Sequence, residues 1–321
     1  MRKTLIISII IIFSFLKISY GVKFTPELKL SAQFLTKKEK KYLGLPGNCK
    51  EFKISQIKSE IKVIEFINIY CFACQKQAPE FNKFYENVKN KNIKFIGIAL
   101  GNCLNEVEHF KKRFKIKFPI VPDPNYKVYE KIGGTRTPFT LILKNNKIIY
   151  EHLGFIENYK PLYCAIFGKN FKKKVVIHEH KFKTLKLTDN FIIQKIKSKF
   201  NKIEDVKKFK NYYKVYADNK IYYVVAITSQ SVCNICHPLQ FIYIITEDGK
   251  IYDLIPIYLT KRFNKKISDR EFDKLRAKLL GKSVLKHLTF NKKVDAITSA
   301  TITSSMIFYF LNQAKQILPI K

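Results

Sequence analysis

Apolar and polar residues follow two different periods along the first half of the chain. Short apolar runs rich in β-branched residues predict buried strands, and apolar positions every three or four residues predict helices. We expect strands at 62–69, 93–100, 139–143 and 147–153, with helices at 74–89 and 105–115. Asn145-Asn146 separates the last two strands and predicts a hairpin turn. The predicted order is β-α-β-α-β-β, with a parallel front half and an antiparallel finish.

A second unit rich in strands follows residues 161–187, which have no strong periodicity and predict an inter-domain connection. Asp-Asn and Asp-Gly pairs between apolar runs are typical of hairpin turns. Ser268 with Glu271 forms a capping box, which predicts the start of a helix. The expected elements are hairpins at 213–228 and 241–257, a helix at 269–280 and a closing helix at 304–316.

The N-terminus has the pattern of an export signal. Met1-Arg2-Lys3 is positively charged, residues 5–16 are a short apolar run, and Ser19-Tyr20-Gly21 offers small residues for a signal peptidase. We therefore predict a signal peptide over 1–21 that is cleaved after Gly21. An uncleaved anchor is the alternative. The protein is accordingly expected to be extracytoplasmic, either periplasmic or associated with the membrane.

Length and charge narrow the function classes. A chain of 321 residues is long enough for two domains, each with its own core. The formal net charge is +35, but the lysines are scattered, and the basic runs at 37–41, 111–113 and 172–174 form no recognisable nucleic-acid module. We expect no nucleic-acid partner. The charge fits solvated surfaces, with steering toward acidic redox partners or an anionic membrane as the other interpretation.

The chain has seven cysteines. The predicted export allows them to form disulfides, because disulfides persist outside the cytoplasm. Four of them form two Cys-x-x-Cys pairs, Cys71/Cys74 and Cys233/Cys236. The remaining three are Cys49, Cys103 and Cys164. Cys49 and Cys103 could pair with each other, but spacing does not establish connectivity.

Cys71-Phe72-Ala73-Cys74 lies between a predicted strand and a predicted helix. The unpaired N–H groups and the dipole of a helix N-terminus stabilise a thiolate. Cys71 is then the expected nucleophile, and Cys74, one turn into the helix, resolves the mixed disulfide. A structural disulfide or half of a zinc site is the alternative.

Three further positions strengthen this interpretation, and together with Cys71/Cys74 they resemble the thioredoxin family. Glu65 stands six residues before Cys71, where thioredoxins have a buried acid that manages the proton of the second cysteine. Pro79 matches the proline of the active-site helix. Thr137-Pro138 matches the cis-proline segment, which packs against the disulfide and offers backbone to an extended substrate. The resemblance covers about residues 45–157, and residues 118–123 resemble the branch that includes TlpA and ResA.

Near the C-terminus, residues 295–301 resemble the sequence on which FMN-binding domains are covalently flavinylated. Asp295, Thr298, Ala300 and Thr301 match the pattern, and Ser299 replaces its usual glycine. The resemblance covers about residues 188–318. It implies that a flavin transferase joins FMN to Thr301 and that the following helix holds the phosphodiester.

A third motif, Cys233-Asn234-Ile235-Cys236-His237, leaves three alternatives open. It matches a c-type haem attachment site with His237 as proximal ligand. It is also compatible with a dithiol that relays electrons between the flavin and Cys71/Cys74, or with an inert disulfide.

The sequence thus predicts an α/β thioredoxin-like fold followed by an α+β FMN-binding domain. The expected division is a signal over 1–21, a thioredoxin-like domain over 22–160, a linker over 161–187 and an FMN-binding domain over 188–321. We expect a thiol-disulfide oxidoreductase that passes electrons between covalent FMN and Cys71/Cys74, with a protein disulfide substrate and an extracytoplasmic electron donor. One alternative is a non-enzymatic flavoprotein or flavocytochrome whose first domain only docks a partner. Another is an oxidoreductase whose second domain carries no flavin.

Overall fold

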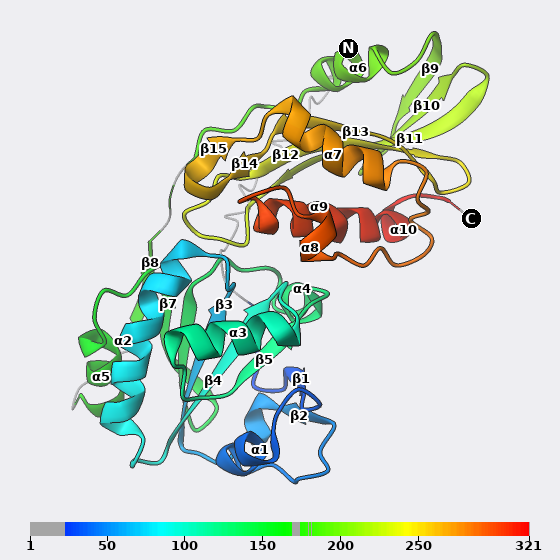
Figure 1. The fold of residues 1–321 in the computed structure, drawn as a ribbon. Helices are drawn as coiled ribbons and strands as arrows, with labels where there is room; N and C mark the ends of the chain where they lie inside the picture. The colour runs from blue at the N-terminus through cyan, green and yellow to red at the C-terminus, as the bar shows by residue number, and fades with distance from the viewer. Residues whose placement is uncertain (1–22, 169–173, 179, 181, 321) are drawn as a thin grey trace, which may run out of the picture.

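Two β-sheets, one in each half of the chain, organise the molecule into two lobes (Figure 1). The computed structural model describes residues 23–168, 174–178, 180 and 182–320. The predicted signal peptide lies outside the described residues. Among the described residues, no helix has both the length and the apolar character needed to cross a membrane.

The first sheet has the strand order β5-β4-β3-β6-β7-β8. Central strand β3 pairs in parallel with β4 and antiparallel with β6, so the predicted change from parallel to antiparallel pairing is confirmed. The strands are β3 (Ile61–Ile67), β4 (Ile93–Leu100), β5 (Ile120–Asp123), β6 (Phe139–Lys144), β7 (Lys147–Leu153) and β8 (Lys174–Ile177). The helices are α2 (Phe72–Val88), α3 (Leu104–Phe114), α4 (Lys127–Lys131) and α5 (Lys160–Phe167).

Both faces of this sheet are covered, which explains why its strands are apolar without alternation. Val63 and Ile67 of β3 pack in the cluster that includes α2, whereas Ile64 and Phe66 pack against the segment before the sheet. That segment, for which the sequence pattern predicted no strand or helix, has ordered elements. They are β1 (Lys29–Ser31), α1 (Lys37–Leu43), β2 (Glu51–Lys53) and the 3-10 turn η1 (Ile54–Gln56).

Residues 161–187, predicted as a connection, contain more structure than expected. Helix α5 extends through the first part of this stretch, and β8 pairs in parallel with β7. The first sheet therefore continues to Ile177. The short length of β8 explains why no periodic signal marked it.

The second sheet is antiparallel throughout, in the order β13-β12-β11-β10-β9. Both predicted hairpins are confirmed, one about Asp218-Asn219 and the other about Asp248-Gly249. The strands are β9 (Ile203–Lys208), β10 (Tyr213–Ala217), β11 (Lys220–Ser229), β12 (Leu239–Thr246) and β13 (Ile251–Tyr258). A separate small hairpin joins β14 (Thr260–Lys261) to β15 (Lys265–Lys266) through the 3-10 turn η2 (Arg262–Asn264).

Helices accompany the second sheet and contribute nearly as many residues to this lobe as its strands do. They are α6 (Asp189–Lys197), α7 (Asp269–Leu279), α8 (Lys292–Asp295), α9 (Thr301–Asn312) and α10 (Ala314–Ile317). The capping box of Ser268 and Glu271 is present at the start of α7, as predicted. The closing helix begins at Thr301, three residues before the expected start at Ser304, and Gln313 separates it from α10.

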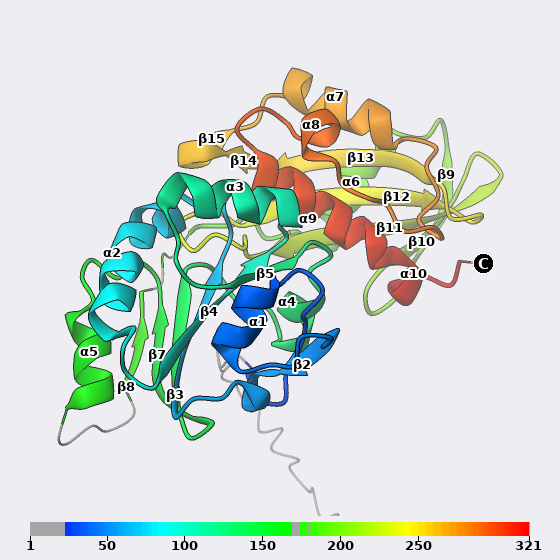
Figure 2. The same ribbon diagram turned by 60° about the horizontal axis from the view of Figure 1, so that its bottom comes forward.

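The two lobes share one apolar core, and α9 lies between its own sheet and the first lobe (Figures 1 and 2). The Tyr126 hydroxyl, between β5 and α4, lies 2.9 Å from Ser305 Oγ on α9 in a buried contact. Gln313 donates a hydrogen bond of 2.6 Å to Glu130. The Gln313–Glu130 contact is exposed, whereas the Tyr126–Ser305 pair is buried in the apolar interface and helps to fix the relative position of its two sides.

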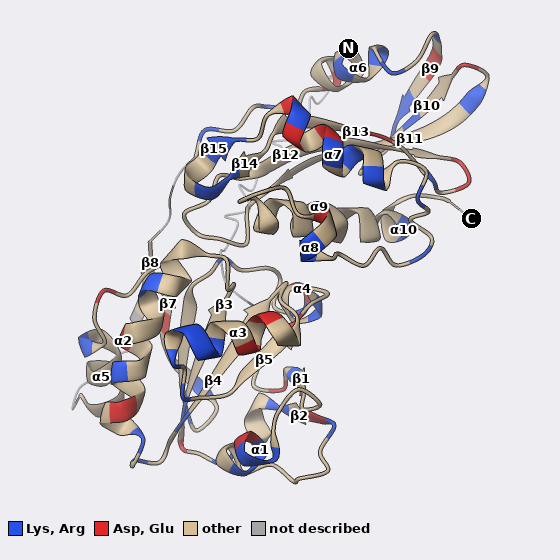
Figure 3. Ribbon diagram, in the orientation of Figure 1, with Lys and Arg blue, Asp and Glu red and all other residues tan. Residues whose placement is uncertain are grey.

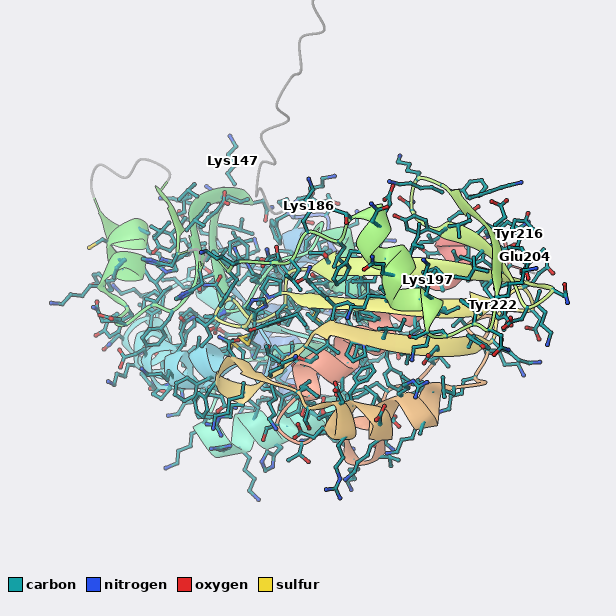
Figure 4. All side chains as sticks on the ribbon, turned by 90° about the horizontal axis from the view of Figure 1, so that it is seen from above. Lys147, Lys186, Lys197, Glu204, Tyr216 and Tyr222 are labelled. Carbon is teal, nitrogen blue, oxygen red and sulfur yellow. A yellow bond between two sulfur atoms is a disulfide. The ribbon has the colours of Figure 1, made fainter. Side chains whose placement is uncertain are left out.

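Lysine and arginine occur on elements of both lobes rather than on one of them (Figure 3). The far end of the second sheet, marked by Glu204 and Tyr216, lies well away from Lys147 in the first lobe (Figure 4). Charge is thus distributed along an elongated pair of lobes.

The turn between β10 and β11 gives a first testable prediction. Asn219 has a φ of +59°, a conformation that disfavours β-branched residues. We expect Asn219→Val to lower the free energy of unfolding by about 1–2 kcal/mol, measured by urea denaturation. Asn219→Gly, the control, should cost much less, and equal losses in the two variants would contradict this account of the turn.

Candidate redox site

The two cysteines of the first Cys-x-x-Cys pair lie where strand β3 passes into helix α2. β3 ends at Ile67, the backbone of Cys71 donates to the carbonyl of Asn68, and Cys71 is the N-cap of α2. Cys71 is 0% exposed and Cys74 is 1% exposed. Both are free thiols in this structure.

The environment separates the pKa values of these two thiols. Burial acts to raise the pKa of Cys71, but hydrogen bonds from the Cys74 thiol and from the backbone of Cys74 and Ala73 outweigh it and lower that pKa. Burial, together with the hydrogen bond to Cys71 and its charge, raises the pKa of Cys74 well above the ordinary value. Cys71 is therefore the thiol that ionises first, which is the property of a nucleophile.

Glu65 lies on β3, on the same face as Val63 and Ile67, and is 5% exposed. The amide of Gln77 on α2 donates to it at 2.9 Å, and the oxygen of the same amide accepts from the backbone of Ile156. Burial raises the pKa of Glu65 to about 8, although the Gln77 hydrogen bond opposes the shift. Glu65 can therefore hold or release a proton near neutral pH.

Thr137 and Pro138 precede β6 and face the dithiol. Their peptide bond is cis, as the resemblance to thioredoxins implies. The Cys71 thiol donates to the Thr137 carbonyl at 3.4 Å. The structure thus brings together four of the predicted site positions, Cys71, Cys74, Thr137 and Pro138. Glu65 lies on central strand β3 and contacts helix α2 through Gln77.

The second Cys-x-x-Cys pair lies directly against the first. Cys233 and Cys236 form a disulfide, and Cys233 Sγ lies 3.5 Å from Cys71 Sγ. The backbone N–H of Thr137 donates to the Val232 carbonyl at 2.7 Å, and the Asn234 N–H donates to the Thr137 carbonyl at 2.9 Å. Residues 162 positions apart in the chain therefore meet sulfur to sulfur.

His237 does not have the surroundings of a haem ligand. Its Nδ1 lies 2.9 Å from the Pro238 carbonyl, and its Nε2 lies 3.2 Å from the Lys183 carbonyl. Its ring lies against that of Tyr258, with ring centres 4.1 Å apart and the ring planes tilted by 35°. Haem attachment needs both thiols of the motif, but Cys233 is only 1% exposed and is bonded to Cys236. The residues present fit a disulfide and do not fit haem c.

The predicted flavin motif forms the entry to α9. Asp295 ends α8, is buried, and accepts a hydrogen bond of 2.8 Å from the backbone of Asn291. Thr298 and Ser299 are exposed. Ser299 has a φ of +61°, and Ala300, the N-cap residue, makes no capping hydrogen bond through its side chain. Thr301 is the first residue of α9 and is half-buried.

This entry is linked to the dithiol site through aromatic and cationic side chains. The Ser299 carbonyl accepts a hydrogen bond of 2.8 Å from the backbone of Arg262. The guanidinium of Arg262 lies 5.8 Å from the ring centre of Phe72, the residue that follows Cys71. Phe263 contacts the same ring edge to face at 6.1 Å. Neither residue was expected to belong to the site, because the turn that carries them has no motif.

A cavity of about 1010 Å³ opens between the lobes beside Tyr70. Tyr70 donates a hydrogen bond to Glu106, and Lys292 of the second lobe lies 4.6 Å from the centre of the Tyr70 ring. Ser305, Phe308 and Asn312 of α9 line the cavity. Sequence reasoning missed this feature, because its walls come from segments that are distant in the chain.

Cys49, Cys103 and Cys164 form no disulfide in the part of the chain that the structure describes. The pairing of Cys49 with Cys103 that spacing allowed is therefore absent. Within that same part, no three His, Cys, Asp or Glu side chains gather as a metal-binding group.

Comparison with known proteins finds relatives of the first lobe. Residues 31–156 match the AhpC/TSA family. The thiol-disulfide oxidoreductase ResA of Bacillus thuringiensis subsp. konkukian is 26% identical over 132 residues, which span 38% of this chain and 75% of that protein. ResA of Bacillus subtilis is 23% identical over 96 residues, which span 30% of this chain and 54% of that protein.

Two solved structures align with 84–87% of their own length. A putative thiol:disulfide interchange protein DsbE from Chlorobium tepidum has a TM-score of 0.34, 20% identity and 38% coverage of this chain. StoA from Bacillus subtilis has a TM-score of 0.31, 23% identity and 34% coverage of this chain. The N-terminal region is thus a thioredoxin-like domain that resembles thiol-disulfide oxidoreductases of the ResA type. The match to the family ends before the second sheet begins.

Glu65 gives a prediction for the pH dependence of stability. Its folded-state pKa of about 8 lies above the ordinary value of 4.5, so the native state retains a proton that the unfolded state loses first. Stability that is present at acidic pH is therefore lost as pH rises from about 4.5 to about 8. In Glu65→Gln, which has no proton to lose, we expect the free energy of unfolding to fall by a few kcal/mol less over this pH range. Denaturant unfolding of the reduced protein from pH 5 to 9 measures the difference. Parallel stability curves for the two proteins would contradict the assignment.

Proposed function

We propose that this protein is an extracytoplasmic thiol-disulfide oxidoreductase that exchanges electrons between Cys71/Cys74 and an FMN carried by its second domain. The observation that carries the proposal is the buried dithiol at the N-terminus of α2, with the Cys71 thiol against the Thr137 carbonyl. The ResA relatives support the same chemistry, because they are named for it. A protein disulfide is the proposed substrate class.

The dithiol performs the reaction in two steps. The Cys71 thiolate attacks one sulfur of a substrate disulfide, and the other substrate sulfur leaves as a thiolate. The Cys74 thiol then loses its proton and attacks Cys71, which releases the reduced substrate. Because the pKa of Cys74 is raised, this second step needs a base. Glu65, whose pKa is about 8, is the group on the central strand that can take that proton when it is ionised, which is its minor form at neutral pH.

The entry to α9 fits an FMN joined to Thr301 through its phosphate. Ser299 adopts the left-handed conformation at the position where the flavinylated pattern has glycine, so the backbone keeps the turn that the pattern requires. The N-cap makes no side-chain hydrogen bond, which leaves N–H groups of the first turn available to a phosphate.

The cavity between the lobes offers room for the rest of such a group. Ser305, Phe308 and Asn312 follow Thr301 at intervals of four, seven and eleven residues, so all four lie on one face of α9. The last three line the cavity, and Tyr70 lines its other side next to Cys71. A bound flavin supplies the ability to accept electrons singly or in pairs, which matches one-electron donors to a two-electron disulfide.

The remaining partners follow from this assignment. Covalent attachment requires a flavin transferase, and turnover requires an electron donor or acceptor outside the cytoplasm. Export by the N-terminal signal places the chain where disulfide substrates occur. We propose no nucleic-acid partner.

A second function is favoured by one observation, the burial of Cys71 beneath the chain's own 232–234 segment. A dithiol covered in this way could pass electrons only within the chain. The protein would then be an electron carrier, and its first domain would dock a partner rather than reduce a free disulfide.

Cysteine variants distinguish the two functions. We expect Cys71→Ser to abolish the acceleration of insulin reduction by dithiothreitol, because the attacking sulfur is lost. Cys103→Ser, the control, removes an exposed free thiol and should keep the wild-type rate. An insulin turbidity assay measures both. Activity that survives in Cys71→Ser would contradict the oxidoreductase, and a wild-type protein without insulin turnover would favour the carrier.

Intact mass tests the flavin. The protein should be produced with a flavin transferase in an export-competent host. We expect a mass increase equal to FMN less water on the peptide that contains Thr301, and its loss in Thr301→Val. Thr184→Val, which changes an exposed hydroxyl outside both the motif and the cavity, should keep the adduct.

Ser299→Gly provides a second control for the same assignment. Because glycine accepts the left-handed conformation readily, this variant should also carry the adduct. An unmodified Thr301 in all of these proteins would leave a thiol oxidoreductase whose second domain carries no flavin.

A further inference from the structure

We propose that the Cys233–Cys236 disulfide is a built-in substrate of Cys71, held in the place that an external protein disulfide would take. The inference rests on the proposed thiol chemistry of Cys71 and Cys74 and is independent of FMN. It assigns a redox role to a pair that the sequence left open between haem ligation, electron relay and an inert disulfide.

The backbone of the 232–234 segment pairs with Thr137 as an added strand does. Thr137 and Cys233 form a parallel bridge, with hydrogen bonds from the Thr137 N–H to Val232 and from the Asn234 N–H to Thr137. The Thr137 hydroxyl also donates to the Val232 carbonyl at 3.0 Å. Pairing of an extended segment with exposed backbone is a common way to bind peptides, in which the backbone gives affinity and the register selects the side chain presented. Here the register presents Cys233.

The two sulfurs are placed for exchange. Cys71 Sγ and Cys233 Sγ are 3.5 Å apart, close to van der Waals contact. Cys71 is a free thiol with a lowered pKa, whereas Cys233 is already bonded to Cys236. Nucleophile and disulfide therefore face each other in the states required for attack.

Other contacts hold the segment from both lobes. The Asn234 amide donates to the His178 carbonyl at 2.7 Å, next to the end of β8. The Val232 N–H donates to the sulfur of Met306 on α9 at 3.4 Å. Val232 and Cys233 are buried in the core that the two lobes share. A disulfide without a redox role would not need contacts from both lobes that hold it opposite a nucleophile.

The exchange balances within the chain. The Cys71 thiolate attacks Cys233, so the Cys71–Cys233 bond forms, the Cys233–Cys236 bond breaks, and Cys236 leaves as a thiolate that takes up a proton. Cys74 loses its proton and attacks Cys71, so a Cys71–Cys74 disulfide forms and Cys233 leaves as a thiolate that is protonated in turn. Two electrons and two protons have then moved from the first pair to the second. The reverse sequence moves them back.

Tethering has two consequences. It keeps the internal disulfide at a high effective concentration, so the exchange is independent of protein concentration. It also closes the dithiol, because Cys71 is 0% exposed while the segment is docked. An external disulfide reaches Cys71 only when the 232–234 segment leaves Thr137.

Trapping the intermediate tests the proposal. Cys74→Ser/Cys236→Ser removes both resolving cysteines and leaves Cys71 opposite Cys233. After mild oxidation with diamide and alkylation of free thiols, we expect a Cys71–Cys233 peptide pair as the main disulfide in non-reducing peptide mapping. The matched control is Cys74→Ser/Cys233→Ser, which leaves Cys236 instead, and its Cys71–Cys236 pair should be at least about tenfold less abundant. Equal yields, or no Cys71–Cys233 pair in the first variant, would overturn the proposal.

Two further measurements keep the test decisive. Circular dichroism shows whether both variants fold, and if either does not, the same mapping is carried out on the wild-type chain quenched with acid during partial reduction. There a Cys71–Cys233 pair supports the proposal and its absence overturns it. Insulin reduction by Cys233→Ser/Cys236→Ser separates failure of this proposal from failure of the proposed oxidoreductase function. Turnover by this variant, when no Cys71–Cys233 pair has been trapped, refutes only the role of Cys233–Cys236 as an internal substrate. Absence of both trapping and turnover refutes the oxidoreductase itself.

Discussion

The pairing of Thr137 with residues 232–234 is the contact on which the arrangement of both lobes depends. Its backbone hydrogen bonds join a loop of the first sheet to a loop of the second, and they lie in a core that the two lobes share. Hydrogen bonds that are buried in this way are costly to leave unmade, so the docked arrangement of the two loops is favoured. This contact therefore acts together with the Tyr126–Ser305 pair to fix the relative position of the lobes, and it sets the separation of the two sulfur pairs.

Burial at this contact also determines the chemistry of the thiols. The hydrogen bonds at the start of α2 lower the pKa of Cys71 against the effect of burial, whereas burial and the neighbouring sulfur raise that of Cys74. Glu65 is kept largely protonated at neutral pH by the same exclusion of water. Cys71 is thus suited to attack, whereas Cys74 needs a base to remove its proton. The difference between the two cysteines originates in the fold rather than in the residue types.

Local signals predicted the elements well and the contacts poorly. The strands and helices around Cys71 and the hairpin about Asp218-Asn219 were predictable, because periodicity and turn residues are properties of neighbouring positions. Strand β8 was not, since four residues carry no periodic signal. The motif Cys233-x-x-Cys236 was visible in the sequence, but its meaning was not, because haem ligation, relay and inert disulfide share one spacing. The short distance from Cys71 to Cys233 is the observation behind the redox role proposed above, and it depends on how two domains pack.

The central claim is that the two cysteine pairs form one redox unit, and the distribution of electrons in the wild-type chain tests it most directly. The fully oxidised protein is given limiting reductant, and the reduced fraction of each pair is followed by differential alkylation and mass spectrometry at several protein concentrations. The account predicts that Cys71/Cys74 and Cys233/Cys236 reach one equilibrium ratio, at a rate that does not change with protein concentration. Two pairs that remain at unrelated levels, or that equilibrate faster as concentration rises, would contradict it.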